Sequence, residues 1–138
     1  MKYIALIIIC LYSINTANAE DITLSFEWGD IPSCSSGTPN VVSNPIFQLS
    51  AIPDGALWVY FNLKDFQSSY KHGGGWVELD ESLLIESGKF KYDSPCPPGG
   101  FHTYEWTAFF TGKKSKIGWN GKPTGVIKVL KAQKQYPE

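Results

Sequence analysis

The segment YDSPCPPGGFHTYEWTAFF, residues 92–110, carries the two patterns that decide the fold. Its first part holds three prolines and two glycines, so we expect a stiff loop from Tyr92 to Gly100. The run from Tyr104 to Phe110 is aromatic and almost continuously apolar, as expected for a strand buried on both faces. His102 and Tyr104 lie two residues apart, so an extended backbone projects both side chains to one face. The segment therefore predicts a preorganised polar patch at the start of a central strand.

Other segments show the same strand periodicity. Ile22–Trp28 and Pro45–Ser50 alternate apolar and polar residues, which predicts strands with one buried face. Ala56–Leu63 is nearly continuous in apolar character and predicts a second central strand, and Val126–Leu130 predicts the last one. No stretch has a convincing amphipathic helical period. The expected class is all-β or β-dominated, with one domain over residues 20–138.

We expect most of the remaining segments to be connections between strands. We expect Gly73–Gly75 to interrupt the strand pattern, and His72 beside it to be an exposed loop residue. Leu83–Ile85 is compatible with a short strand or a helical turn. The tail from Gln133 onward is predicted to be loose. A cluster of lysines after the predicted strand Tyr104–Phe110 should lie in a solvated connection; its members are Lys113, Lys114 and Lys116.

Residues 1–19 have the pattern of a cleavable signal peptide. Lys2 precedes an apolar run from Ile4 to Leu11, and Ala17–Ala19 supplies the small residues of a cleavage site. The run is about half the length that crosses a bilayer, so no stable membrane insertion is expected. A lipoprotein alternative at Cys10 is disfavoured because its motif needs a small residue where Ile9 stands. The predicted destination is the periplasm or the extracellular space.

Charge and cysteine content narrow the possible functions. Twelve basic against thirteen acidic residues give no field that would attract nucleic acid, and every basic residue is lysine. With two histidines in the chain, no metal site or cofactor is expected. Cys34 and Cys96 remain after cleavage, and an even pair in an exported protein predicts a disulfide. Two buried free thiols are the alternative.

Three colinear blocks resemble the phosphatidylethanolamine-binding protein family, in particular its short bacterial, Raf kinase inhibitor-like branch. Residues 92–104 resemble the family signature Tyr-x-Gly-Pro-x-Pro-Pro-x-Gly-x-His-Arg-Tyr. Residues 34–56 are similar to its Cys, Gly, Asn, Ser-Pro and Val-Pro-x-Gly-Thr segment, and Gly74–Val77 to its Gly-Gly-Trp-Val. The resemblance implies a large central, mainly antiparallel sheet with a smaller sheet, and a shallow cavity that binds anions such as phosphate groups.

The resemblance also implies roles for single residues. His102 and Tyr104 match the second His and the Tyr of the cavity, Pro95 matches its wall, and Asp65 matches an acidic residue. Glu78 stands where the family has a ligand-site His after Gly-Gly-Trp-Val. A second departure is at the family's Asp-Pro-Asp-x-Pro motif, which is replaced here by KDFQS at residues 64–68. These departures predict a retained fold with an altered anion site.

The preferred function is therefore an exported, non-enzymatic protein that binds a small anionic or phosphate-bearing ligand. A hydrolase using His102 with Asp65 or Glu78 is disfavoured, because no nucleophile elbow, zinc-spaced histidines or phosphate loop accompanies them. The other alternative is a protein-interaction or inhibitor module. Exposed tryptophans would favour that alternative, and the candidates are Trp58, Trp76, Trp106 and Trp119.

Overall fold

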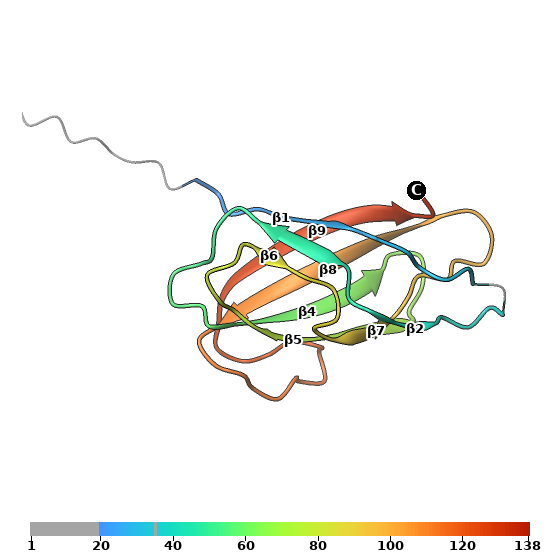
Figure 1. Cartoon of the computed structure of the whole chain (residues 1–138). Helices are drawn as coiled ribbons and strands as arrows, with labels where there is room; N and C mark the ends of the chain where they lie inside the picture. Colours follow the sequence, from blue (N-terminus) through green and yellow to red (C-terminus); the bar gives the residue numbers. More distant parts are fainter. Residues whose placement is uncertain (1–19, 35) are drawn as a thin grey trace, which may run out of the picture.

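Two long strands, β4 and β8, form the centre of the largest sheet (Figure 1). The computed structural model describes residues 20–34 and 36–138, so the predicted signal peptide lies outside the described residues. The sheet has the order β5-β4-β8-β9 and is antiparallel throughout. Its strands are β4 (Trp58–Asp65), β5 (Lys71–Glu78), β8 (His102–Thr111) and β9 (Val126–Tyr136).

Two smaller antiparallel sheets complete the fold. One has the order β1-β3-β6, formed by β1 (Leu24–Glu27), β3 (Ile46–Leu49) and β6 (Leu84–Ile85). The other pairs β2 (Val41–Ser43) with β7 (Lys91–Asp93), to the right in Figure 1. The predicted all-β class and its large central sheet are confirmed. The part of the chain that the structure describes contains no helix that could span a membrane.

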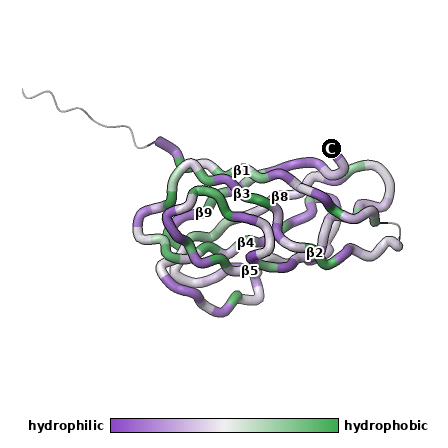
Figure 2. The backbone as a smooth tube through the Cα atoms, in the orientation of Figure 1, coloured by the Kyte–Doolittle hydropathy of each residue, from purple (hydrophilic) through white to green (hydrophobic). Residues whose placement is uncertain are grey.

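The core lies between the four-stranded sheet and the β1-β3-β6 sheet. Phe47 of β3 stacks on Phe61 of β4 with ring centroids 4.0 Å apart, and Trp106 of β8 packs edge-on to both rings. Every second residue of β1, β3 and β4 is buried, as the apolar alternation predicts, and Figure 2 shows the hydropathy along the chain. Burial of these aromatic rings is the main favourable contribution to folding.

The glycine run does not interrupt the sheet as predicted, because Gly73–Gly75 lies inside β5. Gly74 pairs with Asn62, and a Cβ there would collide with the backbone carbonyl of Phe61. A Cβ on Gly75 would enter the ring of Phe90. These two positions need glycine because neighbouring groups occupy the space of a side chain.

The C-terminal tail is also ordered, contrary to the prediction. β9 continues to Tyr136 and pairs along its whole length with β8, ending with Tyr136 opposite His102. The indole Nε1–H of Trp28 donates a hydrogen bond to the backbone oxygen of Gln135 at 2.9 Å. Lys134 bridges to Glu27 at 2.9 Å. The strand β9 thereby holds the start of β8, which carries His102.

Candidate ligand-binding site

A hollow of about 420 Å³ lies where β4 ends and β8 begins. Asp65 is the last residue of β4, and the register places it directly opposite Tyr104 of β8. His102 lies on the same face as Tyr104, as the two-residue spacing predicts, and both line the hollow. The structure thus brings together three of the residues that the sequence singled out.

Asp65 and His102 form a hydrogen-bonded pair at this site. The Nδ1 atom of His102 lies 2.7 Å from Oδ2 of Asp65, and the Asp65 side chain is 4% exposed. Its other oxygen accepts the backbone N–H of Gln67 at 2.8 Å. Burial opposes ionisation of Asp65, but the hydrogen bonds from His102 and Gln67 outweigh it and hold the pKa of the carboxyl below its usual value. Asp65 is therefore ionised at neutral pH, and His102, bound to it through Nδ1, lines the hollow.

His72 is the second imidazole of the hollow and was missed in the sequence. It is buried, with 3% of its surface exposed, rather than lying in an exposed loop. Its Nδ1 atom lies 2.7 Å from the backbone oxygen of Asp93, which can only accept, so Nδ1 carries the hydrogen. The Nε2 atom of His72 is buried and has no hydrogen-bond partner among the described residues.

A β-bulge explains how His72 faces inward although it lies beside the glycine run. Asn62 pairs with Gly74 while Lys64 pairs with Lys71, so β5 has one residue more than β4 between these pairs. Gly73 is in the left-handed region with φ of 80° and absorbs the extra residue. Alternation counted back from Val77 places His72 on the outer face, whereas the bulge turns it inward. In the sequence, the signal for such a bulge is a glycine within a strand-like run.

Tyr104 presents a buried hydroxyl to the same hollow. The side chain is fully buried, and its oxygen makes no hydrogen bond of good geometry within the described chain, although Asp65 and the backbone of Cys96 lie near enough to influence its pKa. Burial, and next the negative charge of Asp65, raise the pKa of the Tyr104 phenol well above its ordinary value. The hydroxyl therefore stays protonated and is available as a donor at neutral pH.

The wall of the hollow comes from the two segments that carry the cysteines. Cys34 and Cys96 are joined by a disulfide, as the sequence predicts, with Cα atoms 5.4 Å apart. This bond holds Gly37, Thr38 and Pro39 against Cys96 and Pro98, and all five residues line the hollow. The loop backbone is also tied to the β7–β8 connection, because the N–H of Ser94 donates to the oxygen of Asn40 at 2.8 Å.

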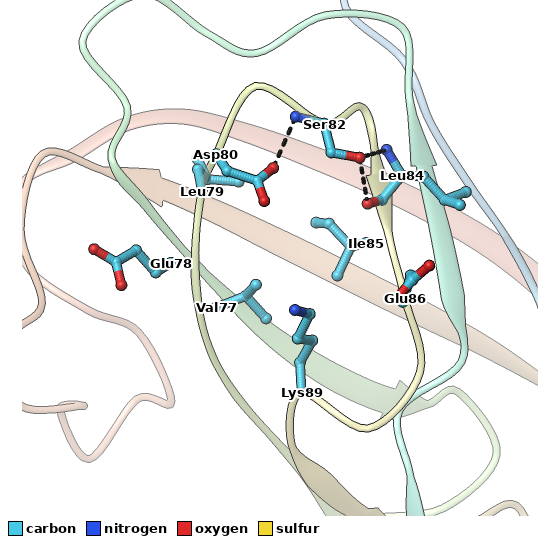
Figure 3. Close-up of a pocket in the computed structure, with 9 residues that line it drawn as sticks. All are labelled: Val77, Glu78, Leu79, Asp80, Ser82, Leu84, Ile85, Glu86 and Lys89. Carbon is cyan, nitrogen blue, oxygen red and sulfur yellow. Dashed lines mark hydrogen bonds between the residues drawn. The ribbon is translucent and has the colours of Figure 1, made fainter.

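Two predicted site residues lie elsewhere. Pro95 is fully buried behind the wall and does not line the hollow, where Pro98 stands instead. Glu78 pairs with Trp58 at the opposite end of β4 and β5. It borders a separate small pocket with Asp80, Ser82 and Lys89, in which its carboxylate points away from Lys89 (Figure 3). The carboxylate of Glu78 therefore does not oppose an anion in the hollow at His72 and His102.

Comparisons with known proteins bear on the fold. No protein-family model matches the sequence, and no curated protein matches it either. A crystal structure of a protein described as a homologue of phosphatidylethanolamine-binding protein, from Chlamydia trachomatis, superposes with a TM-score of 0.58 at 17% identity. The match covers 85% of this chain and 97% of that chain. This chain has a phosphatidylethanolamine-binding-protein-like fold. Within this fold, the four-stranded central sheet places His72, His102 and Tyr104 around one hollow.

Proposed function

We propose that this protein is an exported, non-enzymatic binding protein whose hollow holds a small anionic or phosphate-bearing ligand. The observation that carries the proposal is that two of the three buried polar atoms without partners among the described residues, Nε2 of His72 and the hydroxyl of Tyr104, belong to side chains that line this hollow, whereas the third, Nε1 of Trp106, does not. Leaving such atoms unpaired costs about 1–3 kcal/mol each, so their retention is explained if a ligand completes them.

The charges that line the hollow indicate which ligand would fit. Asp65 is the single carboxylate among its described lining residues, and the two imidazoles are the groups that can become cationic. When both imidazoles are protonated, two positive charges against one negative leave a net charge of +1. Both Nε2 atoms are then donors, and the Tyr104 hydroxyl is a third. Three donors around a positive site match the oxygens of a phosphate group.

Export is supported by the disulfide. Disulfides persist in oxidising compartments, and the Cys34–Cys96 bond closes a loop with a sequence separation of 62. The signal-peptide pattern at residues 1–19 supports the same destination. If the exported protein begins at Glu20, as peptide mapping of its N-terminus can show, this part of the proposal is supported. Retention of Met1–Ala19 would contradict it.

The test is a proton–nitrogen NMR titration of the oxidised protein with inorganic phosphate and with phosphoethanolamine. We expect saturable shifts at the backbone amides of His72, His102 and Tyr104. His102→Asn keeps a donor for Asp65 but removes the imidazole, so it should weaken binding at least about tenfold. Glu78→Gln is the matched control and should leave binding unchanged. An absence of shifts at millimolar ligand would contradict the proposal.

A protein-interaction module is the second candidate, and one residue favours it. Trp119 is 96% exposed, whereas Trp106 is fully buried. Trp58 and Trp76 are half-buried and belong to the outer face of the central sheet. Trp119 alone of these four has the exposure expected of an aromatic anchor. Cross-linking of the exported protein in its native compartment, with Trp119→Ala as the comparison, tests this candidate.

A further inference from the structure

A second hollow, of about 560 Å³, lies on the outer face of β4 and β5. Its floor is formed by Tyr60, Asn62 and Lys64 of β4 and by Lys71 and Gly73 of β5. One wall is the segment 118–121 of the β8–β9 connection, which Figure 1 shows in orange, looping back beneath β5. Ser68 and Tyr70 also border the histidine hollow, so the β4–β5 connection separates the two sites.

Trp119 stands at the rim of this outer hollow in a fixed turn. The N–H of Gly121 donates to the oxygen of Gly118 at 2.9 Å, and the N–H of Gly118 donates to the oxygen of Lys122 at 2.9 Å. The amide oxygen of Asn120 accepts the N–H of Lys122 at 3.1 Å. The turn thus orders its backbone while leaving the indole 96% exposed. A large aromatic ring held in water by an ordered turn is a platform for an apolar ligand face.

The charge of the outer hollow is positive. Lys64 and Lys71 are directly opposite each other on neighbouring strands, where like charges repel. No carboxylate lines the hollow, and neither lysine forms an ion pair within residues 20–34 and 36–138. Glu105, the neighbour of Lys64 on β8, is bound by Lys131 at 3.2 Å and by Gln133 at 2.7 Å. An anionic group above Lys64 and Lys71 would relieve their repulsion.

The surrounding sequence adds to the positive charge near the outer hollow. Residues 106–137 contain seven lysines and neither aspartate nor glutamate. Four of these lysines lie in the connection that carries Trp119, and they are Lys113, Lys114, Lys116 and Lys122. Lys114 is held over the ring of Trp58 at 5.0 Å, so the connection lies against the outer face of the sheet. A negatively charged ligand is therefore attracted from several directions.

The remaining lining groups are neutral hydrogen-bonding side chains. Asn62 and Asn120 contribute amides, Ser68 and Ser69 contribute hydroxyls, and Tyr60 contributes a half-buried phenol. Amides and hydroxyls both donate and accept, as a chain of hydroxyl groups on a ligand requires. Aromatic rings with a negative π-face attract the C–H groups of a sugar ring.

From these features we propose that the outer hollow binds an oligosaccharide that carries carboxylate or sulfate groups. A sugar ring would stack on Trp119, its hydroxyls would reach Asn62 and Asn120, and an acidic substituent would lie over Lys64 and Lys71. An anionic membrane is less well matched, because Gly118 and Asn120 beside Trp119 offer no further apolar group for insertion. This site is separate from the histidine hollow and does not depend on the function proposed for it.

The test is isothermal titration calorimetry of the oxidised protein with trigalacturonate, a heparin-derived tetrasaccharide and trisialic acid. We expect at least one of these to bind with a dissociation constant below about 1 mM. Trp119→Ala should weaken that binding at least about tenfold, and Lys71→Gln about threefold or more. Removing the charge of the ligand, as in methyl-esterified trigalacturonate, should weaken it as well.

Two matched variants separate this proposal from others. Lys89→Gln removes an exposed lysine that lines neither hollow, and His102→Asn changes the histidine hollow; both should bind the oligosaccharide as the wild type does. Failure of all three saccharides to bind overturns the proposal. Equal binding by the Trp119→Ala variant overturns it too, since that result indicates unspecific attraction. Trp119-dependent binding to phosphatidylglycerol vesicles without saccharide binding would identify a membrane site instead.

Discussion

The imidazole of His72 lies edge-on to the ring of Tyr104, with centroids 5.5 Å apart and an interplanar angle of 85°. Each of these side chains also has a buried polar atom without a hydrogen-bond partner among the described residues. Two such unpaired atoms lower the stability of the fold. This relationship suggests that the site trades stability for binding, which mutation can test.

Tyr104→Phe should separate the two effects. The change removes a buried hydroxyl that has no partner in the described part of the chain, so the free energy of unfolding should stay equal or rise by up to about 1 kcal/mol. Phosphate affinity should fall about tenfold, because a donor to the ligand is lost. Urea unfolding and calorimetric titration measure the two quantities. Destabilisation by more than about 1 kcal/mol would show that the hydroxyl has a structural partner.

Anion binding should depend on pH through the two imidazoles. Imidazole is the side chain that ordinarily changes charge between about pH 5 and 8. Asp65 stays ionised over this range because its pKa is held below the usual value. A protonated imidazole adds positive charge to the hollow, so an anion should bind the protonated site at least about tenfold more tightly.

Sulfate is the probe for this prediction, because its own charge does not change over the same range. His72→Asn keeps a donor for the backbone oxygen of Asp93 but removes the imidazole. This variant should show a shallower dependence of sulfate affinity on pH, measured by calorimetry. An affinity that is independent of pH in the wild type would exclude protonated imidazole as the anion's partner.

The sequence predicted the parts of the fold that obey a simple period. The segments Ile22–Trp28, Pro45–Ser50, Ala56–Leu63 and Tyr104–Phe110 follow alternation or continuous burial, and the structure has strands there. The sequence also placed His102 on the same face as Tyr104. These successes share a cause, since each depends on a strand without irregularity.

The failures depend on interactions between distant segments. His72 was expected in an exposed loop because the glycine run looked like an interruption of the strand, whereas Gly73 adds one residue to β5 as a bulge, which depends on the partner strand. Gln133–Tyr136 is polar and looks loose in isolation, yet Trp28 and Glu27 bind it from 107 residues away. Glu78 was misplaced because a matched sequence block does not fix which end of the strand faces the site.

Gly74 tests the claim that the glycine run belongs to the sheet. Gly74→Ala places a Cβ on the backbone carbonyl of Phe61, which cannot move without breaking the pairing of β4 and β5. We expect a loss of about 3 kcal/mol in the free energy of unfolding. Gly112→Ala is the control, because a Cβ there meets its nearest neighbour at an ordinary 3.6 Å. Equal effects of the two changes in urea unfolding would contradict the structure of β5.

Alkaline pH should destabilise the fold through its buried tyrosines. Burial, with a smaller effect of Tyr136, raises the pKa of Tyr92, and burial with the charge of Asp65 raises that of Tyr104. Folding therefore favours the neutral phenols. Their contribution is fully present below the ordinary phenol pKa of about 10 and is lost as the pH rises above it. Phenolate absorbance should rise together with the loss of β-sheet circular dichroism, and the stability of Tyr104→Phe should fall less steeply with pH.

The Cys34–Cys96 disulfide should affect both stability and binding. Replacing both residues by serine removes a cross-link with a sequence separation of 62, for which chain entropy gives a loss of about 4 kcal/mol. The same change frees Gly37, Thr38 and Pro39 from the wall, so phosphate affinity should fall about fivefold as that segment must be ordered on binding. Wild-type protein reduced with dithiothreitol is the control and should match the double variant in urea unfolding and in titration. If stability fell while phosphate affinity stayed unchanged, the wall segment would have no part in holding the ligand, and His72, His102 and Tyr104 would define the site without it.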